Sequence, residues 1–149
     1  MSVRSFFYNR VYVPFRDDRF EDGISGAASY RTAQTAHGFR RVYDGIVRVL
    51  DGIVSSGREL GERVDLRNRY RVQLARLDIT VQYQAARGIL DRDLAEGIKA
   101  ALREVSTALQ RGEVEKAVRA AESLRLALDA VLAYQIVGGR RREEEEEWL

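Results

Sequence analysis

The feature of this chain that most constrains its fold is the recurrence of apolar residues every three or four positions between about residues 39 and 131. This spacing places apolar side chains on one face of an α-helix. It predicts four helices, at about 27–54, 57–86, 91–111 and 113–137. The residues expected to face the core are Phe39, Tyr43, Ile46, Leu50 and Ile53; Leu66, Tyr70, Leu74, Leu77 and Val81; Leu94, Ile98, Leu102, Val105 and Leu109; and Val114, Ala117, Ala121, Leu124, Leu128 and Val131.

Polar residues and glycines mark the expected ends of these helices. Ser56 and Glu59 have the spacing of a capping box and predict the start of the second helix. Either Asp91 or Asp93 is expected to cap the third, while Gly112 and the pair Gly138-Gly139 are expected to end the third and fourth. Short links between amphipathic helices favour antiparallel neighbours. The predicted fold is therefore all-α, with a four-helix bundle-like body.

The N-terminal segment has a different composition. The first 43 residues contain all five phenylalanines and four of the seven tyrosines. In an extended backbone these aromatic residues fall on both sides, and Pro14 lacks the amide proton that a central strand requires. Residues 1–25 are therefore predicted to form an extended arm or edge strand that packs into neighbouring subunits. The residues expected to make these assembly contacts are Phe6, Phe7, Tyr8, Tyr12 and Phe15.

Three glycines lie seven residues apart in the first predicted helix, at Gly38, Gly45 and Gly52. Seven residues are nearly two helical turns, so the three positions share one face. Because glycine weakens a helix by about 1 kcal/mol relative to alanine, three on one face indicate close approach of another backbone at a subunit contact. The alternative is that the region bends or breaks into shorter helices.

The chain divides by composition into three parts. Residues 1–25 are the predicted arm, and residues 26–139 are the predicted helical domain. Residues 140–149 form a charged tail in which three arginines precede five glutamates. Charge blocks of this kind are typical of solvated tails.

Composition also excludes several classes of function. The chain has no Cys and one His, which removes thiol nucleophiles, disulfide frameworks and His-pair metal sites. No glycine-rich phosphate loop or nucleophile elbow occurs. No catalytic residue, metal, cofactor or small-molecule substrate is predicted. Charged residues interrupt the longest apolar stretches, so we expect no membrane span, and a product that remains inside the cell or leaves it by assembly.

Arginine supplies 23 of the 25 basic residues. Its planar guanidinium can bind a phosphate through two parallel hydrogen bonds, although a GC-rich genome would produce the same preference. Through Arg87 the chain carries a net charge of +5, and the remainder carries −3. On the second predicted helix, three arginines project to within about 20° of one another, at 100° per residue. The candidate nucleic-acid-binding residues are Arg63, Arg67, Arg69, Arg71, Arg76 and Arg87.

The arm, the helix with its glycine seam, the arginine-rich helix and the helical C-terminal body resemble in layout the major capsid proteins of archaeal filamentous double-stranded DNA viruses, the rudivirus, lipothrixvirus and tristromavirus group. The resemblance implies paired subunits, of this chain or with a paralogous one, that wrap double-stranded DNA in A-form and build a helical filament. It implies a virion protein, present in the host cytoplasm during assembly. The scarcity of thermolabile residues agrees with a thermophilic host. The alternative function is a helical adaptor or scaffold subunit without nucleic-acid binding.

Overall fold

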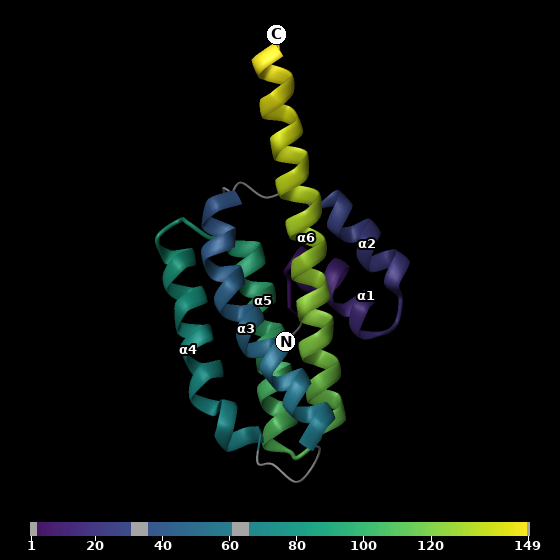
Figure 1. Cartoon of the computed structure of the whole chain (residues 1–149), viewed down its shortest axis with the longest axis vertical. Helices are drawn as coiled ribbons and strands as arrows, with labels where there is room; N and C mark the ends of the chain where they lie inside the picture. Colours follow the sequence, from purple (N-terminus) through teal and green to yellow (C-terminus); the bar gives the residue numbers. More distant parts are fainter. Residues whose placement is uncertain (1–2, 31–35, 61–65, 149) are drawn as a thin grey trace.

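The chain folds as helices throughout the residues that the computed structural model describes, which are 3–30, 36–60 and 66–148, with side chains placed for 3–30, 39–58 and 66–134. No strand occurs in these ranges. The elements, in chain order (Figure 1), are η1 (Phe7–Tyr12), α1 (Val13–Arg16), α2 (Phe20–Ser29), α3 (Ala36–Leu60), α4 (Leu66–Ala86), α5 (Arg92–Gln110) and α6 (Val114–Trp148).

The four long helices form the body of the molecule. Helix α3 packs against α4 and α6, and α5 packs against the same two helices. Figure 1 shows that successive long helices run in opposite directions. The predicted core residues of these helices are confirmed as buried, except that Tyr43 and Val114 are half-buried. Within the described residues, no helix is both long and apolar enough to cross a bilayer.

The prediction of an extended N-terminal arm is wrong. Described residues of this segment form η1, α1 and α2, which pack on one another and on α6. Phe7 and Tyr12 are fully buried and Phe15 is 3 % exposed, so these three side chains belong to the core of their own chain and are not available at a subunit surface. The physical reason is that Phe7, Val11 and Phe15 also have the four-residue spacing of a helix. Pro14 lies in the first turn of α1, where a helix tolerates its missing amide proton.

Asp93 holds the start of this N-terminal segment. Its carboxylate accepts hydrogen bonds from the backbone N–H of Phe6 at 2.6 Å and of Phe7 at 3.0 Å. It also lies 3.0 Å from the Tyr30 hydroxyl, which is 2.9 Å from the Asp91 carboxylate. A carboxylate at these unpaired N–H groups acts as an N-cap supplied by another helix. Asp91 caps α5 itself by accepting from the backbone N–H of Leu94 at 3.1 Å, as one of the two predicted alternatives had it.

Three predicted helix boundaries are wrong. The first long helix does not begin at about residue 27, because α2 ends at Ser29, Tyr30 has an extended backbone and α3 begins at Ala36. Helix α3 continues through the expected capping box, where the Ser56 hydroxyl instead lies 3.0 Å from the Tyr70 hydroxyl of α4. Helix α6 continues through Gly138 and Gly139 to Trp148. Glycine inside a helix costs about 1 kcal/mol but does not end it, and the arginines and glutamates that follow are good helix formers. The end of α5 is as predicted: Gly112 has a φ of +71°, which glycine adopts readily.

The predicted glycine seam has no single role. At Gly52 a Cβ would lie 2.9 Å from the Tyr70 hydroxyl, so the close approach there is to α4 of the same chain. At Gly45 a Cβ would meet nothing within 4 Å. Gly38 lies on the backbone of α3, and its surroundings fall outside the described side chains. Subunit contact through Gly45 stays a prediction.

Two buried tyrosines make the fold sensitive to alkaline pH. Burial, together with the charge of Glu104, raises the pKa of Tyr12, and burial with the charges of Asp93 and Asp91 raises that of Tyr30. Both phenols keep their protons in the folded state at a pH where the unfolded chain, with a tyrosine pKa of about 10, releases them. The contribution of these two tyrosines to stability should therefore be constant below pH of about 10 and be lost as pH rises further.

Ultraviolet absorbance of tyrosinate and circular dichroism, followed together during alkaline titration, measure this effect. We expect the last tyrosines to ionise only as helicity is lost. Ionisation of all seven tyrosines in a chain that keeps its helices would contradict the burial of Tyr12 and Tyr30.

Candidate nucleic-acid interface

Helix α4 has two different faces. Its inner face consists of the five residues predicted to face the core, and all of them are buried against the body: Leu66, Tyr70, Leu74, Leu77 and Val81. Because α4 packs only along this side, against α3 and α5, its opposite side is open in the described structure. In Figure 1, α4 stands at the edge of the body with one side turned outward.

The outward face of α4 carries a line of large apolar side chains. Val72 is 55 % exposed, Ile79 is 66 % exposed and Tyr83 is 57 % exposed. Their spacings of seven and four residues place them on one line, opposite the buried stripe. Three large exposed apolar residues on one helix form a patch that a soluble surface does not need, and such patches are typical of contact sites. The sequence carried this spacing, but our prediction drew only on the arginines of this helix.

Arginines border this line. Arg69 and Arg76 lie along one side of it, and Arg87, in the turn after α4, continues that side. Arg71 lies on the other side of the line and Arg67 nearly opposite Arg69 on the helix; all five side chains are exposed. Arg69 lies over the ring of Tyr70 at 6.0 Å, and Arg87 over the ring of Tyr83 at 5.4 Å. At 1.5 Å per residue, the distance from Arg69 to Arg87 is about 27 Å. The three arginines that were predicted to share one side, Arg69, Arg76 and Arg87, are thus exposed along the same side.

The α4 arginines differ from most of the arginines that connect helices. Arg16 lies 2.7 Å from Glu104, Arg125 lies 3.5 Å from Asp51, and Arg58 pairs with Glu122. Within the described part of the chain, neither the four arginines of α4 nor Arg87, which follows it, makes an ion pair. Helix α4 itself contains one acidic residue, Asp78. Its outward face is therefore a cationic surface whose charges are not neutralised locally.

The remaining predicted site residues are placed as follows. Arg63 lies outside the described residues. Of the predicted assembly residues, Phe6 is 39 % exposed and Tyr8 is half-buried, so both retain some surface for contact. Phe6 packs on Tyr30 with ring centroids 5.7 Å apart.

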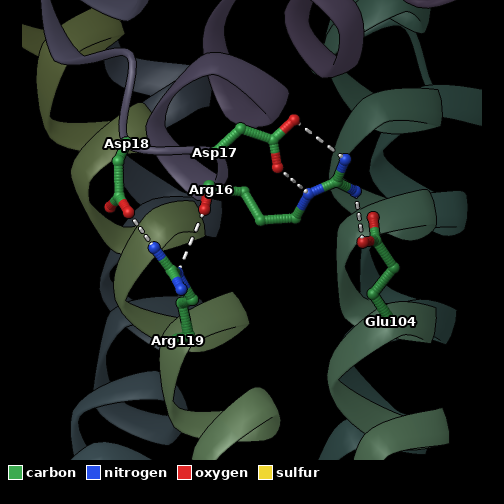
Figure 2. Close-up of polar contacts among 5 residues, drawn as sticks. All are labelled: Arg16, Asp17, Asp18, Glu104 and Arg119. Atoms are coloured by element: carbon green, nitrogen blue, oxygen red, sulfur yellow. Dashed lines mark hydrogen bonds and ion pairs between the residues drawn. The ribbon is translucent and has the colours of Figure 1, made fainter.

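A second polar cluster joins α1 to α5 and α6 (Figure 2). The Arg16 guanidinium contacts the Asp17 carboxylate at 3.0 Å as well as Glu104. Arg119 of α6 donates to the backbone carbonyl of Arg16 at 3.1 Å and pairs with Asp18. The hydrogen bond from Arg16 lowers the pKa of Asp17. These contacts fasten α1 to the body and form one wall of the groove considered below.

The described residues contain no group of three or more His, Asp or Glu side chains placed to hold a metal ion. The chain matches no protein-family model, no curated protein and no solved structure. The function of the chain is therefore inferred from the surfaces of its helices.

Proposed function

We propose that this chain is a structural subunit that binds double-stranded DNA, without reading its sequence, through the outward face of α4. The observation that carries the proposal is the row of Arg69 and Arg76 on α4 and Arg87 just after it, which are exposed, make no ion pair with a described residue and extend over about 27 Å. Arginine binds phosphate through charge-assisted hydrogen bonds. Contacts to phosphates supply affinity and carry no base information.

The proposal includes assembly into a filament. The four helices α3 to α6 would act as a four-helix bundle, with α4 turned toward the duplex. The apolar line of Val72, Ile79 and Tyr83 would then lie where neighbouring subunits meet beside the DNA. In this proposal the chain is a filamentous virion coat protein, paired with itself or with a paralogous subunit, and the DNA takes the A-form that the resemblance implies.

Exchange of Arg69, Arg76 and Arg87 for Gln should weaken binding to a short DNA duplex at least tenfold. Removing three phosphate contacts should also reduce the slope of log affinity against log salt by about three. Fluorescence anisotropy with two duplexes of unrelated sequence, over a range of salt, measures both quantities. The two duplexes should bind equally.

The matched control exchanges Arg4, Arg41 and Arg48 for Gln. These three arginines are also exposed and make no ion pair with a described residue, so the change in net charge is the same. We expect this variant to lose far less affinity than the α4 variant. Equal weakening in the two variants would show that binding follows net charge alone and would remove α4 from the proposal.

The exposed apolar line also favours a second function, that of a helical adaptor whose α4 binds protein. Electron microscopy of the protein with and without double-stranded DNA, at low and raised salt, separates the two functions. A coat protein should form filaments that depend on DNA and dissolve as salt rises. Discrete particles that are indifferent to DNA would contradict the coat proposal and favour the adaptor.

A further inference from the structure

A groove separate from α4 lies between α5 and α6, beside α1. It has a volume of about 480 Å³, within the range of roughly 300 to 1,000 Å³ that is typical of small-molecule sites. Its floor includes the small side chains of Ala108 and Ala120, both buried. Its walls are polar and mostly charged: Arg16, Asp17, Arg103, Glu104, Thr107, Arg111, Glu113, Lys116 and Arg119.

Each carboxylate that lines this groove contacts a cation that also lines it. Asp17 and Glu104 both pair with Arg16, at 3.0 and 2.7 Å (Figure 2). Glu113 lies 3.6 Å from Lys116. Arg103 and Arg111 also line the groove, and neither makes an ion pair in the described part of the chain. The groove therefore holds two guanidinium groups without an ion-pair partner, although Asp17 and Glu104 share the single guanidinium of Arg16 and Oε2 of Glu104 is buried without a hydrogen-bond partner. Its lining carries five cationic side chains, Arg16, Arg103, Arg111, Lys116 and Arg119, against the three carboxylates of Asp17, Glu104 and Glu113.

The two unpaired arginines are aligned. Arg103 and Thr107 of α5 and Arg111, which directly follows α5, are spaced at intervals of four residues, so they lie on one side of the helix and its end. The separation of Arg103 and Arg111 along the axis is about 12 Å at 1.5 Å per residue. The Thr107 hydroxyl lies between them and can donate a hydrogen bond. A ligand that satisfies both arginines must therefore carry negative charge at more than one point.

We propose that this groove binds a small molecule with a chain of phosphate groups, the chemistry shared by nucleoside triphosphates and inorganic polyphosphates. Each guanidinium would bind one phosphate through paired hydrogen bonds, and Thr107 would donate to the phosphate chain between them. The alanine floor leaves room for a flat apolar ring against it. No residue of α4 lines the groove, so this site does not depend on the DNA-binding proposal.

Binding here would also act on the fold. Arg16 of α1 forms part of the wall, while the unpaired arginines belong to α5 and the turn after it. A ligand in the groove would therefore bridge the N-terminal helices and the body. Because a ligand that binds only the folded state stabilises it by mass action, the melting temperature should rise with ligand concentration.

The test is calorimetric titration of the full chain with ATP and, separately, with inorganic tripolyphosphate, supported by thermal melts. We expect saturable binding, and at least tenfold weaker binding when Arg103 and Arg111 are both exchanged for Gln. Since neither side chain has an ion-pair partner among the described residues, the variant should keep its helices, which circular dichroism checks. The matched control exchanges Arg41 and Arg48 of α3 for Gln and should bind as the original chain does.

Two comparisons complete the test. Equal affinity for the two ligands would show that the phosphate chain is sufficient, and tighter binding of ATP would show that the floor contacts its base; either result supports the site. The variant with Gln at positions 69, 76 and 87 should bind both ligands normally. Absence of saturable binding of either ligand would overturn the proposal. Weakening in the α4 or α3 variants equal to that in the groove variant would also overturn it.

Discussion

Exchange of Gly26 for Ala should destabilise the protein by about 3 kcal/mol, the upper part of the range for overpacking a tight contact. Gly26 lies in α2 against η1, and a Cβ at this position would overlap the backbone carbonyl of Arg10. A flexible side chain could move aside, but a carbonyl held in helical structure moves only with its helix. The new methyl group should therefore force α2 away from η1.

Urea denaturation of this variant, followed by circular dichroism, measures the loss. Gly45 provides the matched control, because it is also inside a helix and a Cβ there meets nothing within 4 Å. Its exchange for Ala should stabilise the protein by about 0.5 to 1 kcal/mol. If both variants gained stability, the close packing of η1 on α2 would be disproved.

Exchange of Asp93 for Ala should cost about 3 kcal/mol. The carboxylate accepts hydrogen bonds from the N–H groups of Phe6 and Phe7 and lies within reach of the Tyr30 hydroxyl. Hydrogen bonds to a charged group contribute about 1.5 to 3 kcal/mol each, and loss of an N-cap alone costs about 0.5 to 2 kcal/mol. The alanine variant leaves the Phe7 N–H in a partly buried position without its partner.

Thermal and urea denaturation give the size of this effect, and amide hydrogen exchange shows where it acts. The amides of Phe6 and Phe7 should exchange faster in the alanine variant, while the Asn variant, which keeps one acceptor oxygen, should lose less stability. Asp44 is a suitable control, since its ion pair with Arg40 is 4.0 Å long and both side chains are 63 % exposed. Its exchange for Ala should change stability by less than about 0.5 kcal/mol. A loss at Asp93 no larger than this would contradict its capping role.

The long helices were predictable because their cores obey a local rule. In α5, residues three and four apart share a face, and Leu94, Ile98 and Leu102 are all buried as that spacing predicts. The same rule predicted the arginine stripe of α4, since Arg69 and Arg76 lie two turns apart on a regular helix. Short-range periodicity therefore determines both a buried face and an exposed one.

The N-terminal helices were not predictable by the same means. Their aromatic residues satisfy two periods at once, and the extended interpretation of Phe7 and Phe15 rested on period two. A tertiary contact favours the helical conformation, because the cap comes from Asp93, which is 86 residues from Phe7 in the chain. The absence of a side chain at Gly26 and Gly97 lets the N-terminal segment pack closely. A Cβ at Gly97 would lie 2.6 Å from the Ser5 hydroxyl. A single sequence does not state which distant residues will meet.

The α5–α6 groove was missed for a related reason. The spacing of Arg103, Thr107 and Arg111 could have been noticed, but the same pattern also occurs on ordinary solvated helices. Only the fold shows that the nearby carboxylates contact Arg16 and Lys116, and that Arg103 and Arg111 make no ion pair with a described residue.

The docking of the first thirty residues also fixes an order of events during synthesis. This segment leaves the ribosome before α5 and α6, yet its cap and much of its packing surface belong to those two helices. At about 5 to 20 residues per second, the nascent chain waits several seconds or longer with Phe7, Tyr12 and Phe15 unburied. During that interval these large apolar side chains remain exposed to solvent, and the segment can associate with other chains until α5 and α6 cover it.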